Sequence, residues 1–235
     1  MKKRGFIYVL AILLLNANAL SLYSQKIVEK TFPVSPDDDI SLEFKFANKV
    51  NVTTWDKNEV YVKVSVNINN NSNNDHFELQ FNQHAAGLEI ESEIINLDDL
   101  TQRKRVVKQD RNGEITVIND CTVEMELYFD VKVPKESGLE LETISGDIEI
   151  NGVLGRMDIN TISGYIDLSL PDDHDADLEL SNISGGMYSN FDFTSNQETG
   201  YHHYRRNKVS RRLNNGGTLI NLKTISGDIF LRKSK

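Results

Sequence analysis

The sequence has one cysteine, few basic residues and one long apolar run, and each shortage excludes a class of protein. Cys121 has no second cysteine with which to pair, so disulfides do not hold this fold together, and a buried structural thiol is the simplest interpretation. Outside the amino terminus, no apolar stretch resembles a transmembrane helix. Lys and Arg number 26 against 35 Asp and Glu, and such an acidic surface repels phosphate backbones. We therefore expect no nucleic-acid partner.

The one long apolar run lies at the amino terminus and has the layout of a secretory signal peptide. A basic start, Met1 to Arg4, precedes an apolar run over residues 5–15, and Ala17-Asn18-Ala19 offers the small residues of a cleavage site. A second candidate cut follows Ser24. The run falls short of the ~20 residues that a membrane span needs, so an uncleaved anchor is the weaker alternative. We expect residues 1–24 to be removed and the mature chain to lie in the periplasm, on the cell surface or outside the cell, without a transmembrane anchor.

An internal repeat dominates the second half of the chain. Four segments align without gaps around an Ile-Ser-Gly triplet, over residues 139–150, 157–168, 178–189 and 220–231. The serines of the triplets are 18, 21 and 42 residues apart, so the last interval is twice the one before it. Self-similarity at such a period predicts a stack of equivalent units, with a further, degenerate unit between Phe191 and Gly217.

The apolar pattern changes its phase at each triplet. Before the serine, apolar residues fall at even offsets, as Leu139 and Leu141 do, and after it they fall at odd offsets, as Ile148 does. A straight strand cannot make this change without turning its apolar face to water, so the chain must bend at the triplet, where glycine tolerates the backbone angles required. We therefore assign the eight corner residues a structural role and not a catalytic one. They are Ser145, Gly146, Ser163, Gly164, Ser184, Gly185, Ser226 and Gly227.

These patterns predict an all-β fold, a parallel β-helix or β-solenoid whose rungs lie ~4.8 Å apart. The regular repeats occupy residues 134–235. Residues 25–133 are less regular, and they form either degenerate rungs of the same solenoid or a separate β-sandwich. Alternating apolar stretches predict strands at 40–46, 60–68, 77–81, 88–94 and 123–133, and a charged connection is expected at 98–112.

Few residue constellations in the sequence suggest catalysis. Two residues after the corner serines stand Asp147, Tyr165, Gly186 and Asp228, a column that does not bring two carboxylates together as a glycoside-cleaving enzyme requires. Nucleophile elbows, phosphate-binding glycine loops and zinc-site spacings are absent from the sequence. The acidic loop 171–177 resembles a calcium site in composition but not in spacing. We expect this protein to have no enzymatic activity, no cofactor and no metal site. A polysaccharide-active β-helix enzyme is the minority alternative.

One basic cluster interrupts this acidic chain, in the long insertion before the last repeat. Such a cluster can contact an anionic glycan, an envelope surface or an acidic partner, or it can pair with the carboxylates of the chain itself. It is the candidate partner surface of the sequence. Its members are Arg205, Arg206, Lys208, Arg211 and Arg212.

The repeats also carry a family resemblance. The Thr-Ile-Ser-Gly-Asp-Ile units, the Val-Lys-Val-Pro-Lys stretch at 131–135 and the closing segment 214–229 resemble the bacterial family of proposed adhesins, a domain of unknown function. The resemblance is good over residues 130–235 and holds only in outline over 26–130. It implies an exported envelope protein with a parallel β-solenoid fold, and it carries no catalytic or binding residues over to this chain.

Together these features predict a non-enzymatic exported envelope protein that serves as an adhesin or scaffold and binds an unknown surface, glycan or envelope protein partner. A periplasmic sensor or accessory protein in envelope signalling is the first alternative. Stacked faces suit either role, because they offer extended binding surfaces.

Overall fold

The computed structural model describes residues 25–35, 38–85, 87–109, 115–152, 155–193 and 207–234. These residues form an all-β fold of two mixed sheets with eight strands each, together with a two-stranded hairpin and two short 3-10 turns. The expected signal peptide, residues 1–24, lies outside them. Within the described ranges, no helix is long and apolar enough to cross a membrane.

All five strands predicted from alternation in the less regular half are present, as β2, β4, β5, β6 and β9. In chain order the strands are β1 (Lys26–Pro33), β2 (Asp39–Glu43), β3 (Lys49–Trp55), β4 (Glu59–Ile68), β5 (Phe77–His84), β6 (Gly87–Ile94), β7 (Gln102–Gln109), β8 (Ile115–Thr122), β9 (Met125–Pro134), β10 (Gly138–Ser145), β11 (Asp147–Asn151), β12 (Met157–Ser163), β13 (Ile166–Leu170), β14 (Ala176–Ser184), β15 (Met187–Ser189), β16 (Asn207–Leu213), β17 (Thr218–Ser226) and β18 (Ile229–Lys233), with the 3-10 turns η1 (Asn74–His76) and η2 (Leu97–Leu100).

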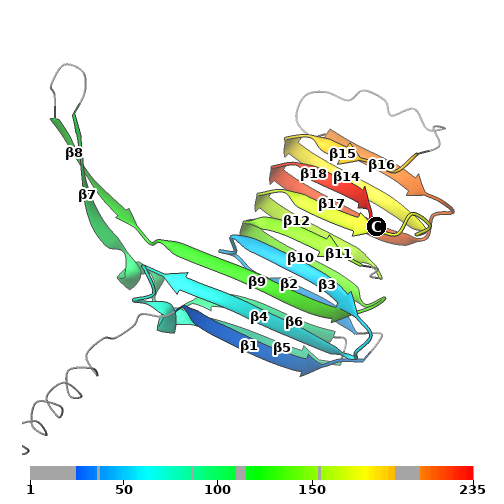
Figure 1. The fold of residues 1–235 in the computed structure, drawn as a ribbon, viewed down its shortest axis with the longest axis horizontal. Helices are drawn as coiled ribbons and strands as arrows, with labels where there is room; N and C mark the ends of the chain where they lie inside the picture. Colours follow the sequence, from blue (N-terminus) through cyan, green and yellow to red (C-terminus); the bar gives the residue numbers. More distant parts are fainter. Residues whose placement is uncertain are drawn as a thin grey trace, which may run out of the picture.

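The segment 98–112 was predicted to be a charged connection, but it contains strand β7. This strand pairs with β8 to form a hairpin that projects from the sheets (Figure 1). The segment Gln102–Gln109 lacks apolar alternation, so its strand character depends on the pairing with β8 and leaves little trace in its own sequence. Cys121 falls on β8, and its side chain lies outside the described part of the structure.

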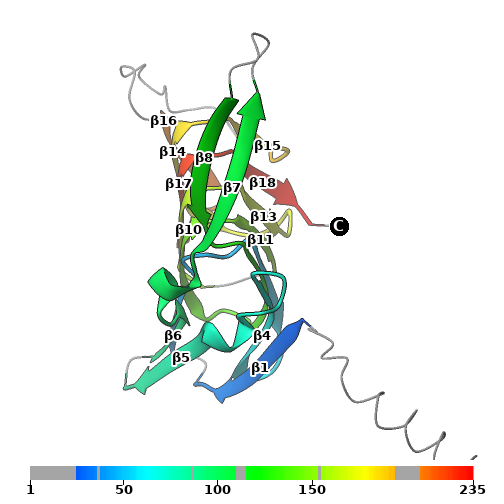
Figure 2. The same cartoon turned by 90° about the vertical axis from the view of Figure 1, so that its left-hand side faces the viewer.

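Strands from the two sheets join in pairs that we call rungs. The four repeats form β10–β11, β12–β13, β14–β15 and β17–β18, and β2–β3 forms a fifth rung. β6 and β9 make a sixth, into which the β7–β8 hairpin is inserted. The same two sheets therefore run through the less regular half and the repeats, and they face each other across the core (Figure 2).

The rungs do not stack in chain order. The first sheet has the order β1-β4-β9-β3-β11-β13-β18-β15, and the second has the order β16-β14-β17-β12-β10-β2-β6-β5. The last repeat, β17–β18, is thus inserted between β12–β13 and β14–β15, and β2–β3 lies between β6–β9 and β10–β11. Equivalent residues of neighbouring repeats are in register, as Leu139 is with Met157 and Met157 with Ile220.

The prediction of a further, degenerate repeat between Phe191 and Gly217 is wrong for the described part of that span. Its strand, β16, runs antiparallel to β14 at the edge of the second sheet. The serines of the last two repeats are 42 residues apart because the edge strand β16 lies between them in the chain. The last repeat then takes its place in the stack next to the third repeat, on the side away from this edge. Ser189 stands where the other repeats have Ile150, Leu168 and Leu231, and the strand β15 that ends at Ser189 has only three residues.

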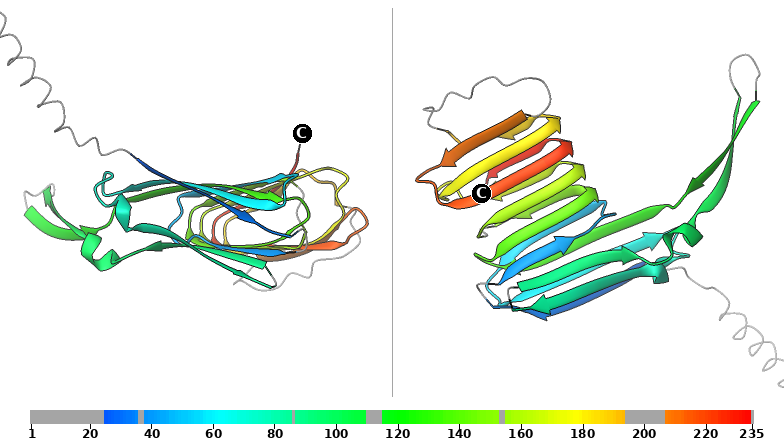
Figure 3. Two further views of the ribbon diagram at one scale, coloured as in Figure 1. Left: turned by 90° about the horizontal axis from the view of Figure 1, so that it is seen from below. Right: turned by 180° about the vertical axis from the view of Figure 1, so that it is seen from behind.

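Antiparallel strands flank both ends of the parallel stack. β4 and β1 follow β9 in the first sheet, β5 follows β6 in the second, and β16 covers β14 (Figure 3). The fold is therefore solenoid-like, with mixed sheets, and not the parallel β-helix throughout that the repeats predict. A terminal parallel rung would leave an open apolar face, and the added antiparallel strands help to cover it, while β1, β15, β16 and β5 are the edge strands of the two sheets in the described residues.

In the corner of the second repeat, three residues have different roles. Thr161 points inward, and its Oγ1 donates a hydrogen bond to the carbonyl of Ser163 (3.2 Å). Ile162 points outward and is exposed. Gly164 has φ +132°, and a Cβ at this position would lie 2.2 Å from the carbonyl oxygen of Gly146 in the next rung. The chain bends here because glycine allows both the backbone angle and the close approach of the rungs.

Candidate functional site

The basic cluster lies at the edge of the second sheet. Arg205 and Arg206 fall outside the described residues, whereas Lys208, Arg211 and Arg212 lie on β16. The structure therefore places three of the five predicted members on one strand. The register of β16 on β14 then decides what each can reach.

Two of these cations contact carboxylates on β14. Lys208 Nζ lies 3.0 Å from Glu179 Oε2, and Arg212 Nε lies 3.3 Å from Asp177 Oδ1. All four side chains are well exposed, so each pair contributes ~1 kcal/mol or less. The pairs help to hold β16 against β14.

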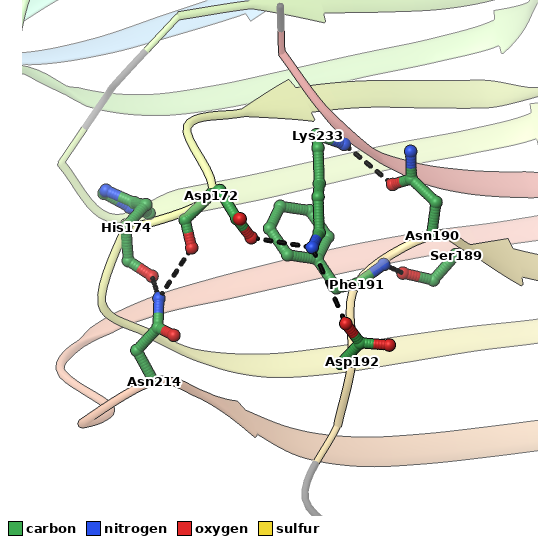
Figure 4. Close-up of polar contacts among 8 residues, drawn as sticks. All are labelled: Asp172, His174, Ser189, Asn190, Phe191, Asp192, Asn214 and Lys233. Atoms are coloured by element: carbon green, nitrogen blue, oxygen red, sulfur yellow. Dashed lines mark hydrogen bonds and ion pairs between the residues drawn. The ribbon is translucent and has the colours of Figure 1, made fainter.

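The acidic loop 171–177 is fastened by contacts within the chain (Figure 4). Lys233 Nζ lies 2.8 Å from Asp172 Oδ1 and 3.8 Å from Asp192 Oδ2. The carbonyls of Asp172 and His174 accept hydrogen bonds from Asn214 Nδ2, at 3.0 and 2.7 Å. The loop therefore joins the end of β13 to the carboxyl-terminal strand and to the turn after β16.

Calcium is expected to leave the melting temperature unchanged. Asp172 is already paired with Lys233, and Asp175 accepts hydrogen bonds from the backbone and side chain of Asn215, which lower the pKa of that carboxyl. In the part of the chain that is described, no three His, Cys, Asp or Glu side chains are placed to hold a metal ion. Thermal unfolding with excess calcium and with a chelator checks this, and a rise in melting temperature that the chelator reverses would contradict it.

Exposed isoleucines form a row along one corner of the stack. In stack order they are Ile144, Ile162, Ile225 and Ile183. Three of them, Ile144, Ile162 and Ile225, line an open groove of about 290 Å³. Its polar lining residues are Glu43, Lys45, Glu142, Thr143, Asn160, Thr161 and Lys223. The surface of the groove is mainly apolar, with a smaller polar part.

Three aromatic side chains meet on the outward face of the first sheet, at the end that β15 occupies. The ring centroid of Phe230, on β18, lies 5.2 Å from that of Tyr188 on β15, with the rings 17° from parallel. On its other side, Phe230 lies 6.0 Å from the ring of Tyr165, which precedes β13, at an angle of 80°. Tyr188 is 55% exposed. We call these three residues the aromatic row.

The glycine at position 186 makes room for Tyr188. A Cβ there would lie 2.4 Å from the Tyr188 Oη and 2.5 Å from its Cζ. The tyrosine therefore lies back over the backbone of its own strand. This explains why Gly186 stands in a column where two other repeats have aspartate.

A hydrogen-bonded carboxylate holds the Tyr165 end of the row. Glu149 accepts hydrogen bonds from Lys49 Nζ (2.8 Å) and Tyr165 Oη (2.5 Å). These two donors, Lys49 foremost, lower the pKa of Glu149, and the bond to Glu149 raises the pKa of Tyr165 well above its ordinary value. At neutral pH Glu149 is thus ionised and the Tyr165 hydroxyl keeps its proton.

An ion pair flanks Phe230. Arg232 Nη2 lies 3.0 Å from Asp167 Oδ2, and the guanidinium carbon lies 5.0 Å from the centre of the Phe230 ring. Burial raises the pKa of Asp167, and the charge of Arg232 opposes this rise. The second carboxylate oxygen, Asp167 Oδ1, is buried and has no hydrogen-bond partner among the described residues. The acceptor capacity of Asp167 is therefore only partly used.

Two further carboxylates beside the corners bind backbone amides. Asp147 Oδ1 accepts the N–H of Tyr165 (3.2 Å), and Asp228 Oδ1 accepts the N–H of Gly186 (2.7 Å). In the stack these residues follow one another as Asp147, Tyr165, Asp228 and Gly186. Each aspartate thus fastens the next rung, and Tyr165 separates the two.

The aromatic row is a site that the sequence did not reveal. Tyr188 and Phe230 stand in the outward column four residues after the serine, and Tyr165 stands two residues after it. Their outward positions were readable, but chain order separates Phe230 from Tyr165 by a whole repeat. The inserted rung β17–β18 brings Phe230 between the other two rings.

A comparison with protein-family models decides the family. The model described as Toastrack DUF4097 matches residues 65–232, well over half of the chain. The chain belongs to this family. The Toastrack match covers every rung except β2–β3, so it includes the repeats, the inserted last rung and the aromatic row.

One solved structure shares the overall fold of this chain, and others align at lower scores. A crystal structure of a proposed cell adhesion protein from Clostridium sporogenes aligns with a TM-score of 0.51 at 11% identity, covering 90% of this chain and 100% of the other. A proposed lipid-binding protein from Parabacteroides distasonis aligns at 0.26 and 11% identity, covering 89% and 97%. A proposed adhesin from Bacteroides fragilis aligns at 0.24 and 9%, covering 90% and 98%. No curated protein matches the chain. At these identities the likeness concerns the fold.

Proposed function

We propose that this protein is a non-enzymatic binding module of the bacterial cell envelope, exported and acting as an adhesin. The observation that carries the proposal is the aromatic row, in which Tyr165, Phe230 and Tyr188 gather on an outward face. Tyr188 is exposed and the other two rings are half-buried, and aromatic surface that stays accessible in one place after folding is typical of a contact site. The rungs of the solenoid supply a long, stiff face on which such a site can be presented.

Export and adhesion have independent support. The amino-terminal residues have the layout of a signal peptide, which favours a location in the envelope or outside the cell. The family match and the shared fold with a proposed cell adhesion protein favour a binding role. The acidic balance of the chain disfavours nucleic acid as the target.

The state of the carboxylates supports binding over catalysis. Asp147 and Asp228 bind backbone amides, and Glu149 and Asp167 bind cations. A glycoside-cleaving enzyme needs two carboxyl groups that face one bond, one of them ready to donate a proton. The carboxylates around the aromatic row are instead engaged in holding the surface together.

Labelled mature chain is expected to bind intact bacterial cells or purified envelope fragments in a saturable manner. The double variant Phe230→Ser, Tyr188→Ser is expected to bind at least tenfold more weakly, because it removes most of the exposed ring surface. Binding isotherms on envelope fragments measure both, and Tyr128→Ser serves as the control, since Tyr128 is also an exposed residue of the first sheet but lies on β9. Absence of saturable binding would contradict the proposal, as would equal binding by all three proteins.

A further inference from the structure

The aromatic row is fixed in place before any ligand arrives. Phe230 is held between two other rings and beside the guanidinium of Arg232. Tyr165 is tied by its hydroxyl to Glu149, and Tyr188 lies over Gly186. A ligand that stacks on these rings therefore loses little free energy in ordering the surface.

Polar groups surround the rings on several sides. Asp167 and Arg232 lie beside Phe230, and Glu149 lies beside Tyr165. Carboxylates accept hydrogen bonds from hydroxyl groups, and a guanidinium donates them. An acyl chain or an apolar peptide that covered the row would take these ion pairs out of water, and it would offer no hydrogen-bond partner to the N–H groups of Arg232 that Asp167 does not use.

A sugar ring offers the chemistry that this surface lacks. Its axial C–H bonds form an apolar face with positive hydrogen atoms, which suits the negative face of an aromatic ring. Its rim carries hydroxyl groups, which can bind the neighbouring carboxylate and guanidinium groups. The combination of ring faces with carboxylates and an arginine therefore favours carbohydrate over lipid.

The charges near the row favour a neutral carbohydrate. Carboxylates outnumber cations there, as they do in the whole chain, whose formal net charge is −9. An anionic glycan would meet net repulsion, which is strongest at low ionic strength. The carboxylates are Asp147, Glu149, Asp167 and Asp228, and the cations are Lys49 and Arg232.

The row also has a direction. Its rings come from β13, β18 and β15 or the residues beside them, which are consecutive strands of the first sheet. Consecutive strands lie ~4.8 Å apart, so the row runs across the strands and along the stack. This spacing allows neighbouring sugars of an extended chain to contact neighbouring rings.

We propose that the aromatic row binds extended chains of neutral polysaccharide. A sugar ring stacks on Tyr188, the exposed ring at the end of the row, while Arg232, whose side chain is also exposed, donates hydrogen bonds to hydroxyl groups at the edge of the sugar. The proposal rests on the proposed function in one respect, because it names the ligand class of the same surface. It extends that function by specifying neutral polysaccharide in place of acyl chains or anionic glycans.

Affinity electrophoresis tests the proposal with residues 25–235, which contain both sheets. Native gels hold one polysaccharide each: hydroxyethyl cellulose, glycogen or mannan as neutral probes, and polygalacturonate as the anionic probe. We expect retardation in at least one neutral gel and none with polygalacturonate. Phe230→Ala and Tyr188→Ala should each lower the affinity measured from the retardation at least tenfold. Phe230→Trp should preserve this affinity, and the matched control Tyr128→Ala should leave it unchanged.

Three results would overturn the proposal. The first is that no neutral polysaccharide retards the chain, and the second is that Phe230→Ala and Tyr188→Ala, shown by thermal unfolding to be folded, are retarded as strongly as the parent. The third is a dimer in sedimentation that the same variants dissociate, because the row would then bind a second copy of the chain. Saturable binding to envelope fragments without any retardation by neutral polysaccharide would refute the glycan proposal and leave the adhesin proposal standing, and loss of both would refute both.

Discussion

Gly164→Ala is expected to lower the free energy of unfolding by roughly 2–6 kcal/mol, because backbone strain and overpacking each cost ~1–3 kcal/mol. Gly164 has φ +132°, a backbone conformation in which residues other than glycine are strained. Its added Cβ would lie 2.2 Å from the carbonyl oxygen of Gly146, which is backbone of the neighbouring rung and cannot rotate away. Relief requires these two rungs to separate and weakens bonds such as that from Gly146 N–H to the carbonyl of Ser163 (2.9 Å).

The adjacent serine provides the control for this prediction. Ser163 is exposed, so Ser163→Ala is expected to change the free energy of unfolding by no more than ~0.5 kcal/mol. Urea unfolding curves measure both variants, with the midpoint reporting stability where the slope is unchanged. Equal midpoints for the two variants would show that the glycine does not have the steric role assigned to it.

Ile159→Ala is expected to cost ~2–5 kcal/mol, the usual range for emptying a filled core position. Ile159 is 0% exposed, and it lies on β12 between Leu141 and Leu222 of the neighbouring rungs. Stacked columns of this kind are continuous, so the cavity removes contacts on both sides of the rung. The lost stability should appear as a lower urea midpoint.

Ile162 offers a matched comparison three residues away. It is the same residue type on the same strand but is 47% exposed at the corner, so Ile162→Ala should cost less than ~1 kcal/mol. A difference of several-fold between the two isoleucines is therefore expected in urea unfolding. Similar losses would mean that the inward and outward columns are assigned incorrectly.

The corners and columns could be predicted because they depend on local sequence. The change of apolar phase at Ile-Ser-Gly indicated a bend, and Leu139, Leu141 and Ile148 all point into the core as that phase requires. The same reasoning located the strands β2, β4, β5, β6 and β9. Side-chain alternation has a period of two, so short windows suffice to read it.

The order of the rungs could not be predicted, because the repeats are nearly interchangeable. Each repeat presents the same alternation and the same corner, so any rung can pair with any other in register. Insertion of β17–β18 between two earlier rungs leaves no mark in its own sequence. The antiparallel strands β1, β5 and β16 likewise depend on which strand lies next to them, which is a property of the whole fold.

The order of the rings in the aromatic row depends on the order of the rungs. In chain order, Tyr188 would lie between Tyr165 and Phe230. The inserted rung places Phe230 between the other two rings and leaves Tyr188 at the end of the row, so this arrangement is a consequence of topology. The basic cluster, in contrast, was visible in sequence as a local excess of charge, although the contacts of Lys208 and Arg212 with β14 required the register of β16.

The central claim is that the corners hold the fold while the outward rings bind the target. Envelope-binding isotherms of two folded variants test it directly: Tyr188→Ala, and a variant in which alanine replaces all four corner serines. The corner serines are Ser145, Ser163, Ser184 and Ser226. The account predicts that Tyr188→Ala loses at least tenfold in affinity and that the serine variant binds as the parent does. Loss of binding in the serine variant, with full binding by Tyr188→Ala, would contradict it.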